Sequence, residues 1–268
     1  MTKAYEELHL TNSFGYSENL MPGRFADRTV IVTGAGSGIG RATALRVARE
    51  AGRVVAADWS RERLDELVAE NPDLDLIPVA GDISDEDDVQ AIVAAAGDVI
   101  DGLVNNAGIM DEFQPVHEVS DEVWERVFRV NVTGMMRMSR AVIARMLPRH
   151  KGSVVNIASE AGLRGSAAGV AYTAAKHAVV GITRNCSVMY AHQGVRVNAV
   201  APGAVQTHIE AKFSSPMAME RLGPLMQLVI PAVAQPEELA AVITFLLSGN
   251  SSNMSGAIIT CDGGWSAI

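Results

Sequence analysis

The chain has 268 residues, 48% of them hydrophobic and 20% charged, which is the balance of a globular protein with enough apolar material for a core. Its net charge of −9 opposes nonspecific binding to nucleic acid or to an anionic membrane, and no run approaches the ~18 apolar residues that span a bilayer. Cys186 and Cys261 are too few for a disulfide framework, so we expect a reducing compartment, the cytoplasm.

The first half of the chain alternates short apolar runs with helical patterns. Residues 1–24 are polar and show no sustained period, so we expect an N-terminal arm ahead of a single domain over residues 25–268. Three strands are predicted at "TVIV", "RVVAAD" and "LDLIPVAGD". The accompanying helices are expected to end at Gly52 as a C-cap and to begin after Ser60 and Ser84 as N-caps.

The second half continues this alternation. Four further strands are predicted at "VIDGLVNNAG", "KGSVVNIAS", "GVRVNAVAPG" and "SGAIITCDGG". A helical stretch from about Asp121 to Leu147 is expected to stop at Pro148, and "AYTAAKHAVVGITRNCSVMYAH" is a further helix. Strands separated by helices of about ten residues or more favour right-handed βαβ units. The sequence therefore predicts an α/β fold with a doubly wound parallel sheet that has helices on both faces.

A glycine cluster, "TGAGSGIG" at residues 33–40, lies between the first strand and the first helix. Its glycines follow the spacing TGxxxGxG and not GxGxxG. Glycines at such a turn allow unusual φ angles and a close backbone approach, while amides at the helix N-terminus can face a pyrophosphate. The turn alone is equally compatible with a tight connection between strand and helix.

Asp58 supports the nucleotide-binding interpretation of this turn. It ends the second strand 18 residues after Gly40, close to the ~20 expected of a carboxylate that binds the ribose hydroxyls of a dinucleotide. Such a carboxylate would repel a 2′-phosphate, and neither Trp59 nor Ser37 offers a compensating positive charge. The alternative, that Asp58 caps the next helix, is weaker because Ser60 is better placed. The pattern therefore favours NAD over NADP.

The stretch "YTAAK" places Tyr172 and Lys176 about one helical turn apart on the same face. A tyrosine hydroxyl titrates near pKa ~10, and an ammonium held close to it favours the phenolate and lowers that pKa. A tyrosine of this kind can give or take a proton. The pair alone is also compatible with an ordinary helix surface.

Seven motifs, in order, resemble the short-chain dehydrogenase/reductase family over residues 25–268. They are TGxxxGxG at 33–40, "GD" at 81–82, "NNAG" at 105–108, "NVTG" at 131–134, "IAS" ending at Ser159, "YTAAK", and "PGAVQT" at 202–207. The resemblance implies a single-domain Rossmann-type fold with about seven strands in the order 3-2-1-4-5-6-7. It also implies an oxidoreductase that acts on CH–OH groups with a nicotinamide cofactor, here NAD.

The resemblance assigns a catalytic quartet, Asn131, Ser159, Tyr172 and Lys176. Tyr172 exchanges a proton with the substrate oxygen, and Ser159 donates a hydrogen bond to that oxygen. Lys176 lowers the tyrosine pKa and binds the nicotinamide ribose, and Asn131 would hold a water that connects Lys176 to solvent. The cofactor contacts implied are Gly34, Ser37, Gly38, Ile39, Gly40, Asp58, Trp59, Asp82, Ile83, Asn105, Ala107, Gly108, Tyr172, Lys176, Pro202, Gly203, Val205 and Thr207.

Residues 208–231 lie where the family carries a mobile substrate lid, and they are rich in methionine and leucine. Flexible thioethers suit an adaptable apolar pocket, although the same residues are compatible with an ordinary packing helix. The expected substrate is a mostly apolar secondary alcohol or ketone. The residues expected to line its pocket are Met110, Phe113, Glu160, Leu163, Arg164 and Met217.

Two other functions stay open. A 3-oxoacyl-thioester (acyl carrier protein) reductase that uses NADPH matches the motifs almost as well, and Asp58 argues against it. A non-catalytic NAD-binding sensor or scaffold would not need the complete quartet. The resemblance also implies a homotetramer that pairs the helices carrying "NVTG" and "YTAAK". No metal is expected, because none of the following has metal-ligand spacing: His117, His177, His192 and His208.

Overall fold

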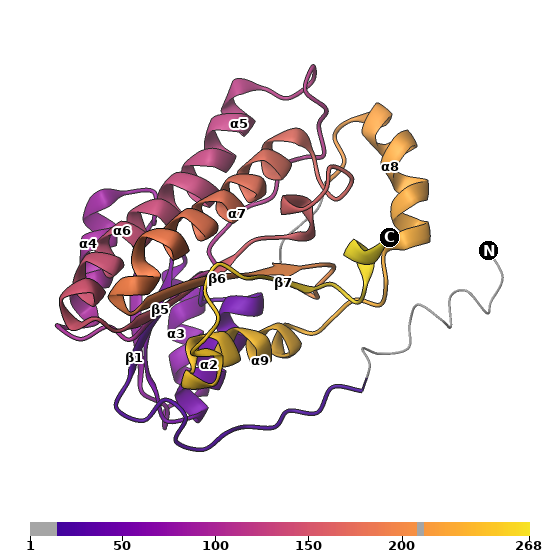
Figure 1. Ribbon diagram of the computed structural model, residues 1–268. Helices are drawn as coiled ribbons and strands as arrows, with labels where there is room; N and C mark the ends of the chain where they lie inside the picture. Colours follow the sequence, from indigo (N-terminus) through magenta and orange to yellow (C-terminus); the bar gives the residue numbers. More distant parts are fainter. Residues whose placement is uncertain (1–14, 208–211) are drawn as a thin grey trace.

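The computed structural model describes residues 15–207 and 212–268 and shows one parallel sheet between layers of helices (Figure 1). The strands stand in the order β3-β2-β1-β4-β5-β6-β7, and every neighbouring pair is parallel. The predicted fold class and strand order are confirmed. The strands are β1 (Thr29–Thr33), β2 (Arg53–Asp58), β3 (Leu76–Ala80), β4 (Gly102–Asn105), β5 (Gly152–Ile157), β6 (Val195–Pro202) and β7 (Ile258–Cys261).

Helices cover both faces of the sheet, as expected for parallel strands joined by helical crossovers. On one face α2, α3 and α9 bury side chains such as Val47, Leu64 and Ile243 against the sheet. On the other face α4 and α6 do so with Ile92 and Val142, beside α7. The helices are α2 (Gly38–Arg49), α3 (Arg61–Glu70), α4 (Glu86–Ala95), α5 (Asp121–Phe128), α6 (Met135–Met146), α7 (Val170–Tyr190), α8 (Pro216–Val229) and α9 (Pro236–Leu247).

The long helical stretch predicted over 121–147 is present but not uniform. A π-helical turn, Arg129–Gly134, separates α5 from α6, and Pro148 lies inside a short 3₁₀ turn, Leu147–Arg149, at the end of α6. A π turn inserts one extra residue into the helical repeat and so re-aims the side chains within it. Asn131 lies in this turn and is buried.

Two predicted helix caps were wrong. Helix α4 is capped by Asp85, whose carboxylate accepts from the Asp87 and Asp88 amides at 2.8 and 3.2 Å, and not by Ser84. A carboxylate accepts both amides at once and complements the helix dipole better than a hydroxyl.

The C-cap of α2 is Glu50, and the residue with positive φ (72°) is Ala51, not the glycine that follows. Gly52 is needed there for space. A Cβ at Gly52 would lie 2.7 Å from a Val47 methyl carbon and 2.8 Å from the Phe25 Cβ. The close approach of Phe25, and not the backbone conformation, accounts for this glycine.

Residues 15–24, the part of the expected arm that the structure describes, lie against α2. Arg24 donates two hydrogen bonds of 2.5 Å to the carboxylate of Glu50, which is 0% exposed. Arg46 also approaches Glu50, at 3.4 Å, and donates to the Tyr16 hydroxyl and the Asn19 carbonyl. Glu50 therefore joins the N-terminal segment to the domain through two largely buried guanidinium groups.

Replacing Glu50 by Gln is expected to lower the free energy of unfolding by about 3–5 kcal/mol, because two buried arginines lose their counter-charge. Urea denaturation measures this. The matched control is Glu70→Gln, whose pair with Arg41 is more exposed and is expected to contribute at most about 1 kcal/mol. Equal effects of the two substitutions would contradict the role assigned to Glu50.

Candidate active site

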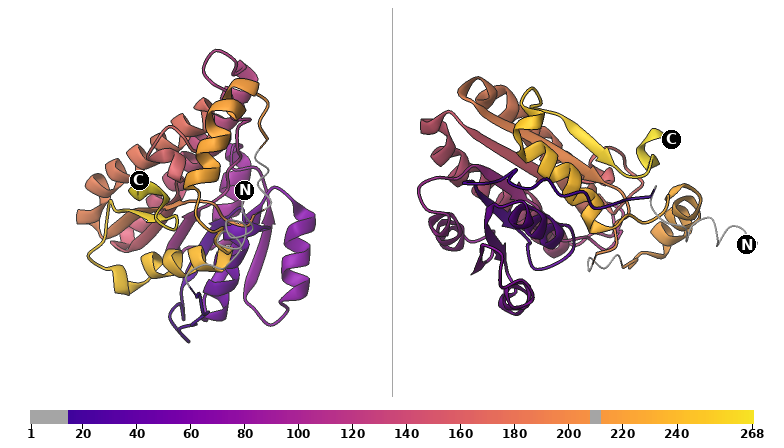
Figure 2. Two further views of the ribbon diagram at one scale, coloured as in Figure 1. Left: turned by 90° about the vertical axis from the view of Figure 1, so that its right-hand side faces the viewer. Right: turned by 90° about the horizontal axis from the view of Figure 1, so that it is seen from below.

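A cleft of about 710 Å³ opens at the carboxyl end of the sheet. The strand order reverses between β1 and β4, so the loops after these strands diverge, and such a switch point is where open α/β sheets bind ligands. The left view of Figure 2 looks onto this edge, with α8 at the top. The predicted cofactor residues that line the cleft are Gly34, Ser37, Gly38, Ile39, Asp58, Trp59, Asp82, Ile83, Ala107, Gly108 and Thr207.

The glycine turn folds tightly at the start of α2. Gly34 and Gly38 have positive φ angles of 66° and 51°, and a Cβ at Gly40 would collide with the Gly34 carbonyl oxygen. Asn106, in the loop after β4, stabilises the turn: its side-chain amide donates to the Thr33 and Gly34 carbonyl oxygens at 3.0 and 3.2 Å. Gly40 thus leaves room for the Gly34 carbonyl within the turn, while Gly34 and Gly38 line the cleft.

The N-terminus of α2 is open toward the cleft. Its N-cap Ser37 makes no side-chain cap, its first turn carries no acidic residue, and Ser37, Gly38 and Ile39 line the cleft. Free amides and the positive end of the helix dipole favour an anion. These groups fit the pyrophosphate of a dinucleotide.

Asp58 lies on the rim beyond this turn. Its carboxylate is buried and accepts from the Gly36 and Ser60 amides, each at 2.9 Å. Arg63, which the sequence analysis missed, lines the same rim. A Cβ at Gly36 would lie 2.8 Å from the Arg63 Cβ and 2.9 Å from an Asp58 oxygen, so both side chains reach this glycine. Arg63 therefore lines the same rim as Asp58, and it is a basic residue that Trp59 and Ser37 did not indicate.

The four residues of the predicted quartet converge beside Gly108. The Ser159 side chain lies near enough to the Tyr172 hydroxyl to lower its pKa, and the Lys176 ammonium lies 5.4 Å from the centroid of the Tyr172 ring. A Cβ at Gly108 would lie 3.1 Å from the Asn131 amide oxygen and 3.7 Å from Lys176 Nζ. Since Gly108 lines the cleft, the quartet stands at its inner end.

The side chain of Asn131 is bound to main chain. Its amide donates to the Ile109 carbonyl at 2.8 Å and accepts from the Ile109 amide at 2.8 Å. Lys176 likewise donates to the Ile157 carbonyl at 2.7 Å. Asn131 therefore shapes the loop after β4, and the water-holding role implied by the resemblance stays a prediction.

The pKa expected for Tyr172 was wrong in direction. Burial raises the pKa of Tyr172 to about 12; the hydrogen bond from Ser159 lowers it and the charge of Asp111 raises it. Burial also lowers the pKa of Lys176 to about 8, because the ammonium leaves water for a site where, among the described residues, it donates to the Ile157 carbonyl and pairs with no carboxylate. The helical spacing of the pair was right, but it carries no information on how deeply both groups are buried.

The side chain of Asn105 does not line the cleft. Its buried amide donates to the Ser139 hydroxyl at 2.9 Å and to the Asn156 side chain at 2.8 Å, so it joins β4 to β5 and α6 inside the fold. The neighbouring Asn106 lines the cleft instead. Successive residues leaving a strand point to opposite sides, and the motif "NNAG" does not say which asparagine faces the ligand. Three further predicted contacts lie at the end of β6, outside the cleft lining: Pro202, Gly203 and Val205.

The predicted substrate residues do not form one surface. Met110 lines the cleft, whereas Phe113 is buried and stacks on Phe213 at 4.1 Å. Glu160 is buried and paired with Arg164, and Leu163 is partly exposed.

Helix α8 leaves its methionines outside the core. Met217 is 56% exposed, and the only residue of α8 that is buried is Ala218. The alternative, a helix that packs these methionines into the core, therefore does not hold for the described part of the lid segment. Residues 208–211, including His208, lie outside the described residues.

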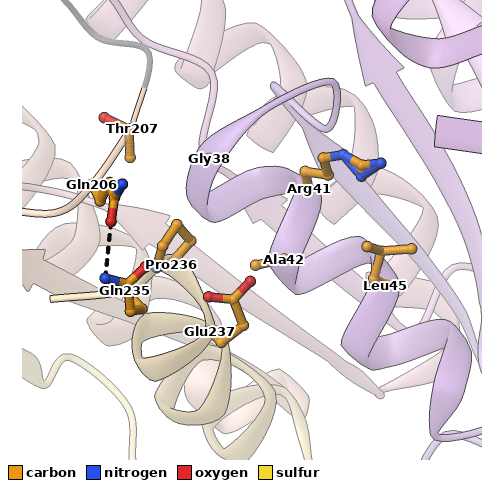
Figure 3. Close-up of a pocket in the computed structure, with 9 residues that line it drawn as sticks. All are labelled: Gly38, Arg41, Ala42, Leu45, Gln206, Thr207, Gln235, Pro236 and Glu237. Atoms are coloured by element: carbon orange, nitrogen blue, oxygen red, sulfur yellow. Dashed lines mark hydrogen bonds between the residues drawn. The ribbon is translucent and has the colours of Figure 1, made fainter. Parts of the chain in front are cut away.

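A second hollow of about 490 Å³ lies behind the glycine turn, between α2 and α9 (Figure 3). Gln206 and Gln235 are hydrogen-bonded to each other at 2.9 Å beside the start of α9, and Gly38 and Thr207 line both this hollow and the cleft. Within residues 15–207 and 212–268, no three acidic, histidine or cysteine side chains are grouped as a metal site. No helix in the same part of the chain is long and apolar enough to cross a membrane.

Comparison with known proteins relates this arrangement to one family. The family model "short chain dehydrogenase" matches residues 28–218. The chain is 38% identical to a 3beta-hydroxysteroid dehydrogenase 2 of Eggerthella lenta, over 90% of this chain and 96% of that protein. It is also 38% identical to a levodione reductase of Leifsonia aquatica, over 91% of this chain and 96% of that protein.

Solved structures of similar proteins share the fold over nearly the whole chain. A 3-oxoacyl-[acyl-carrier protein] reductase of Brucella melitensis with bound NAD has a TM-score of 0.82 at 29% identity, covering 94% of this chain and 97% of its own. A protein described as an NAD(P)-dependent gluconate 5-dehydrogenase of Beutenbergia cavernae, with bound NADP, has a TM-score of 0.79 at 35% identity, covering 92% and 100%.

Gly40→Ala is expected to weaken binding of ADP, a probe of the pyrophosphate cradle, at least tenfold, or about 1.4 kcal/mol. The reason is that its Cβ would collide with the Gly34 carbonyl and reshape the turn. Isothermal titration calorimetry measures the affinity. Gly181→Ala is the control, because a Cβ at this helical position meets open space. Equal ADP affinity of the Gly40 variant and the parent would contradict the prediction.

Proposed function

The chain belongs to the short-chain dehydrogenase family, and on this premise we propose that it is an NAD-dependent oxidoreductase acting on a mostly apolar secondary alcohol or its ketone. The observation that carries the proposal is the convergence of Ser159, Tyr172 and Lys176 beside Gly108, which lines a cleft that fits a dinucleotide. An oxidoreductase needs these two features together.

In this proposal the glycine turn and the N-terminus of α2 hold the pyrophosphate, and Asp58 accepts hydrogen bonds from the adenosine ribose. Lys176 binds the second ribose. The nicotinamide ring, when bound, supplies or accepts the hydride. Ser159 donates a hydrogen bond to the substrate oxygen, where negative charge develops.

Tyr172 handles the proton in either direction. With its pKa raised to about 12, Tyr172 keeps its proton at neutral pH, which suits donation to the oxygen of a ketone as it is reduced. Oxidation of the alcohol needs the phenolate as proton acceptor, so it becomes faster as the pH rises toward the pKa of Tyr172. The pH of the assay therefore decides which direction is observed.

The proposed substrate class rests on the apolar side chains near the cleft and on the substrates for which two relatives are named. Met110 lines the cleft, and α8 holds exposed methionines beyond the carboxyl end of the sheet (Figure 1). One relative is named for a 3β-hydroxysteroid and another for levodione. The test is the initial rate of NADH formation at pH 9 with NAD⁺ and a panel of hydroxysteroids, cyclic alcohols, polyols and 3-hydroxyacyl thioesters, with NADP⁺ in parallel. The proposal expects a hydroxysteroid or cyclic alcohol, with NAD⁺, to be fastest.

Arg63 favours a second candidate, the 3-oxoacyl-thioester reductase that uses NADPH. A guanidinium is a phosphate-binding group, and Arg63 lines the same cleft as Asp58. Two structural relatives carry that reductase name, one of them with bound NAD. Activity confined to NADP⁺ and acyl thioesters would support this candidate and overturn the first.

We also propose a homotetramer in the cytoplasm. Support for the assembly comes from apolar side chains on the outer faces of α5 and α7: Trp124, stacked on Phe128 at 4.6 Å, Met189, and Val188, which is 79% exposed. Helices with such faces are suited to packing against copies of themselves. A mass equal to the 28.4 kDa of one chain in light scattering would contradict the tetramer.

Tyr172→Phe is expected to lower kcat by roughly 10²–10⁴, because general acid–base catalysis by the hydroxyl is lost, while NADH still binds. Stopped-flow rates and NADH fluorescence measure the two properties. A non-catalytic NAD-binding sensor or scaffold would instead show no turnover before or after the substitution.

Asp58→Asn is expected to raise the Kd for NAD⁺ by roughly 10–100-fold, since a hydrogen bond to a charged group contributes about 1.5–3 kcal/mol. The Kd for NADP⁺ is expected to fall, because the charge that opposes a 2′-phosphate is removed while Arg63 stays. Arg63→Ala is the matched variant and should weaken only NADP⁺. A parallel loss for both cofactors in Asp58→Asn would contradict this account.

A further inference from the structure

We propose that Asp111 is a positioning residue, whose buried carboxylate ties the loop after β4 to the first turn of α7 and thereby places the hydroxyl of Tyr172. This inference rests on the proposed function. It concerns a residue that none of the sequence motifs includes, and its three contacts all go to main chain.

The carboxylate of Asp111 takes the place of a missing helix cap. Asp111 is 3% exposed; one oxygen accepts from the Phe113 and Gly169 amides, each at 3.1 Å, and the other accepts from the amide of Tyr172 itself at 2.9 Å. The N-cap of α7 is Gly169, which has no side chain to cap the helix. The free amides of this first turn are thus satisfied by a residue 58 positions earlier in the chain.

The junction has little room to move. A Cβ at Gly169 would lie 2.5 Å from an Asp111 oxygen and 2.7 Å from the Gln114 amide nitrogen. The Val170 amide also donates to the Gln114 carbonyl at 3.0 Å. The start of α7 is therefore held against residues 111–114 by side-chain and main-chain contacts together.

The same loop is held at its other end by Asn131, through the paired hydrogen bonds to Ile109. Only Met110 separates Ile109 from Asp111 in the chain. Asn131 on the π turn and Tyr172 on α7 are consequently linked through three consecutive residues. A change at Asp111 would shift Tyr172 relative to Asn131 and to Ser159, which stands at the end of β5.

The segment that leads into α8 rests on this loop as well. Ser214 donates its amide to the Glu112 carbonyl at 3.1 Å, and Phe213 stacks on Phe113, whose φ of 58° is unusual for a residue with a side chain. The amide of Phe113 is held by Asp111. By holding the amide of Phe113, the carboxylate of Asp111 also supports the stacking of Phe113 on Phe213, which precedes α8.

The charge of Asp111 provides a second way to test its role, through the pKa of Tyr172. The charged groups facing Tyr172 are Asp111 from the loop after β4 and Lys176 from α7, with the neutral Ser159 beside them from β5. The negative charge of Asp111 contributes to the raised pKa of Tyr172, after burial. Removing that charge lowers the pKa of the tyrosine, and a pKa that does not move would mean that the charge of Asp111 does not act on Tyr172.

The test uses the full chain and compares Asp111→Asn with the parent for the alcohol that the panel identifies. The amide keeps the shape of the carboxylate but offers only one accepting oxygen, so Tyr172 or Gly169 loses its acceptor. We expect kcat to fall at least tenfold with the Kd for NADH unchanged, because the glycine turn is not involved. The midpoint of the pH profile of kcat for oxidation is expected to move to lower pH.

A double-mutant cycle separates positioning from general damage. In a Tyr172→Phe background, Asp111→Asn is expected to cause no further loss of kcat, because it acts through the tyrosine. Asp85→Asn is the control, since Asp85 caps α4 through two amides in the same way, outside the proposed catalytic and cofactor contacts. Unchanged kcat in Asp111→Asn, or an additive loss with an unmoved pH profile, would overturn the proposal.

A measurement without substrate keeps this proposal distinct from the proposed function. Amide hydrogen exchange at Tyr172 or at Gly169 is expected to accelerate at least tenfold in Asp111→Asn, and not in Asp85→Asn, because one of these two amides loses its buried acceptor. Unchanged exchange would overturn the tie even in an active enzyme. If the parent shows no turnover but exchange accelerates in the variant, the proposed function is contradicted, whereas the contact of Asp111 with the first turn of α7 is supported.

Discussion

Burial of a parallel sheet on both faces is the constraint on which the rest of this molecule depends. Every strand must return through a crossover, so all seven carboxyl ends lie at one edge, and the loops that leave them meet there. The glycine turn follows β1, Gly108 follows β4, and Ser159 follows β5. The reversal of strand order between β1 and β4 leaves the cleft between these loops.

The loop after β4 connects the parts of the site that come from different crossovers. Asn106 holds the glycine turn, Ile109 is held by Asn131, and Asp111 holds the first turn of α7. These are contacts to main chain in surroundings largely closed to water, where an acceptor left without a donor is costly. One short segment therefore sets the distance between the cofactor cradle and the proton-transfer group.

Burial determines the pKa values of Tyr172 and Lys176 more strongly than the proximity of the two side chains does. Both Tyr172 and Lys176 are buried, and burial acts on them in opposite directions, raising the pKa of Tyr172 to about 12 and lowering the pKa of Lys176 to about 8. A neutral phenol and a lysine close to losing its charge are both energetically acceptable in a dry site. The rim differs: there Asp58 and Arg63 place opposite charges at the opening of the cleft.

Local pattern in the sequence determined the alternation of strands and helices, the strand order through family resemblance, and the presence of the glycine turn, Asp58 and the quartet at one edge. The alternation and the glycine turn follow from periodicity and from residue types that a short segment displays by itself, whereas the strand order and the quartet were predicted from the family resemblance. The tertiary structure alone decided which of Asn105 and Asn106 faces the cleft, that Arg63 shares the rim with Asp58, that Phe113 is buried, and that Asp111 caps α7. Each of these depends on segments far apart in the chain, and on the depth of burial, which spacing along the chain does not encode.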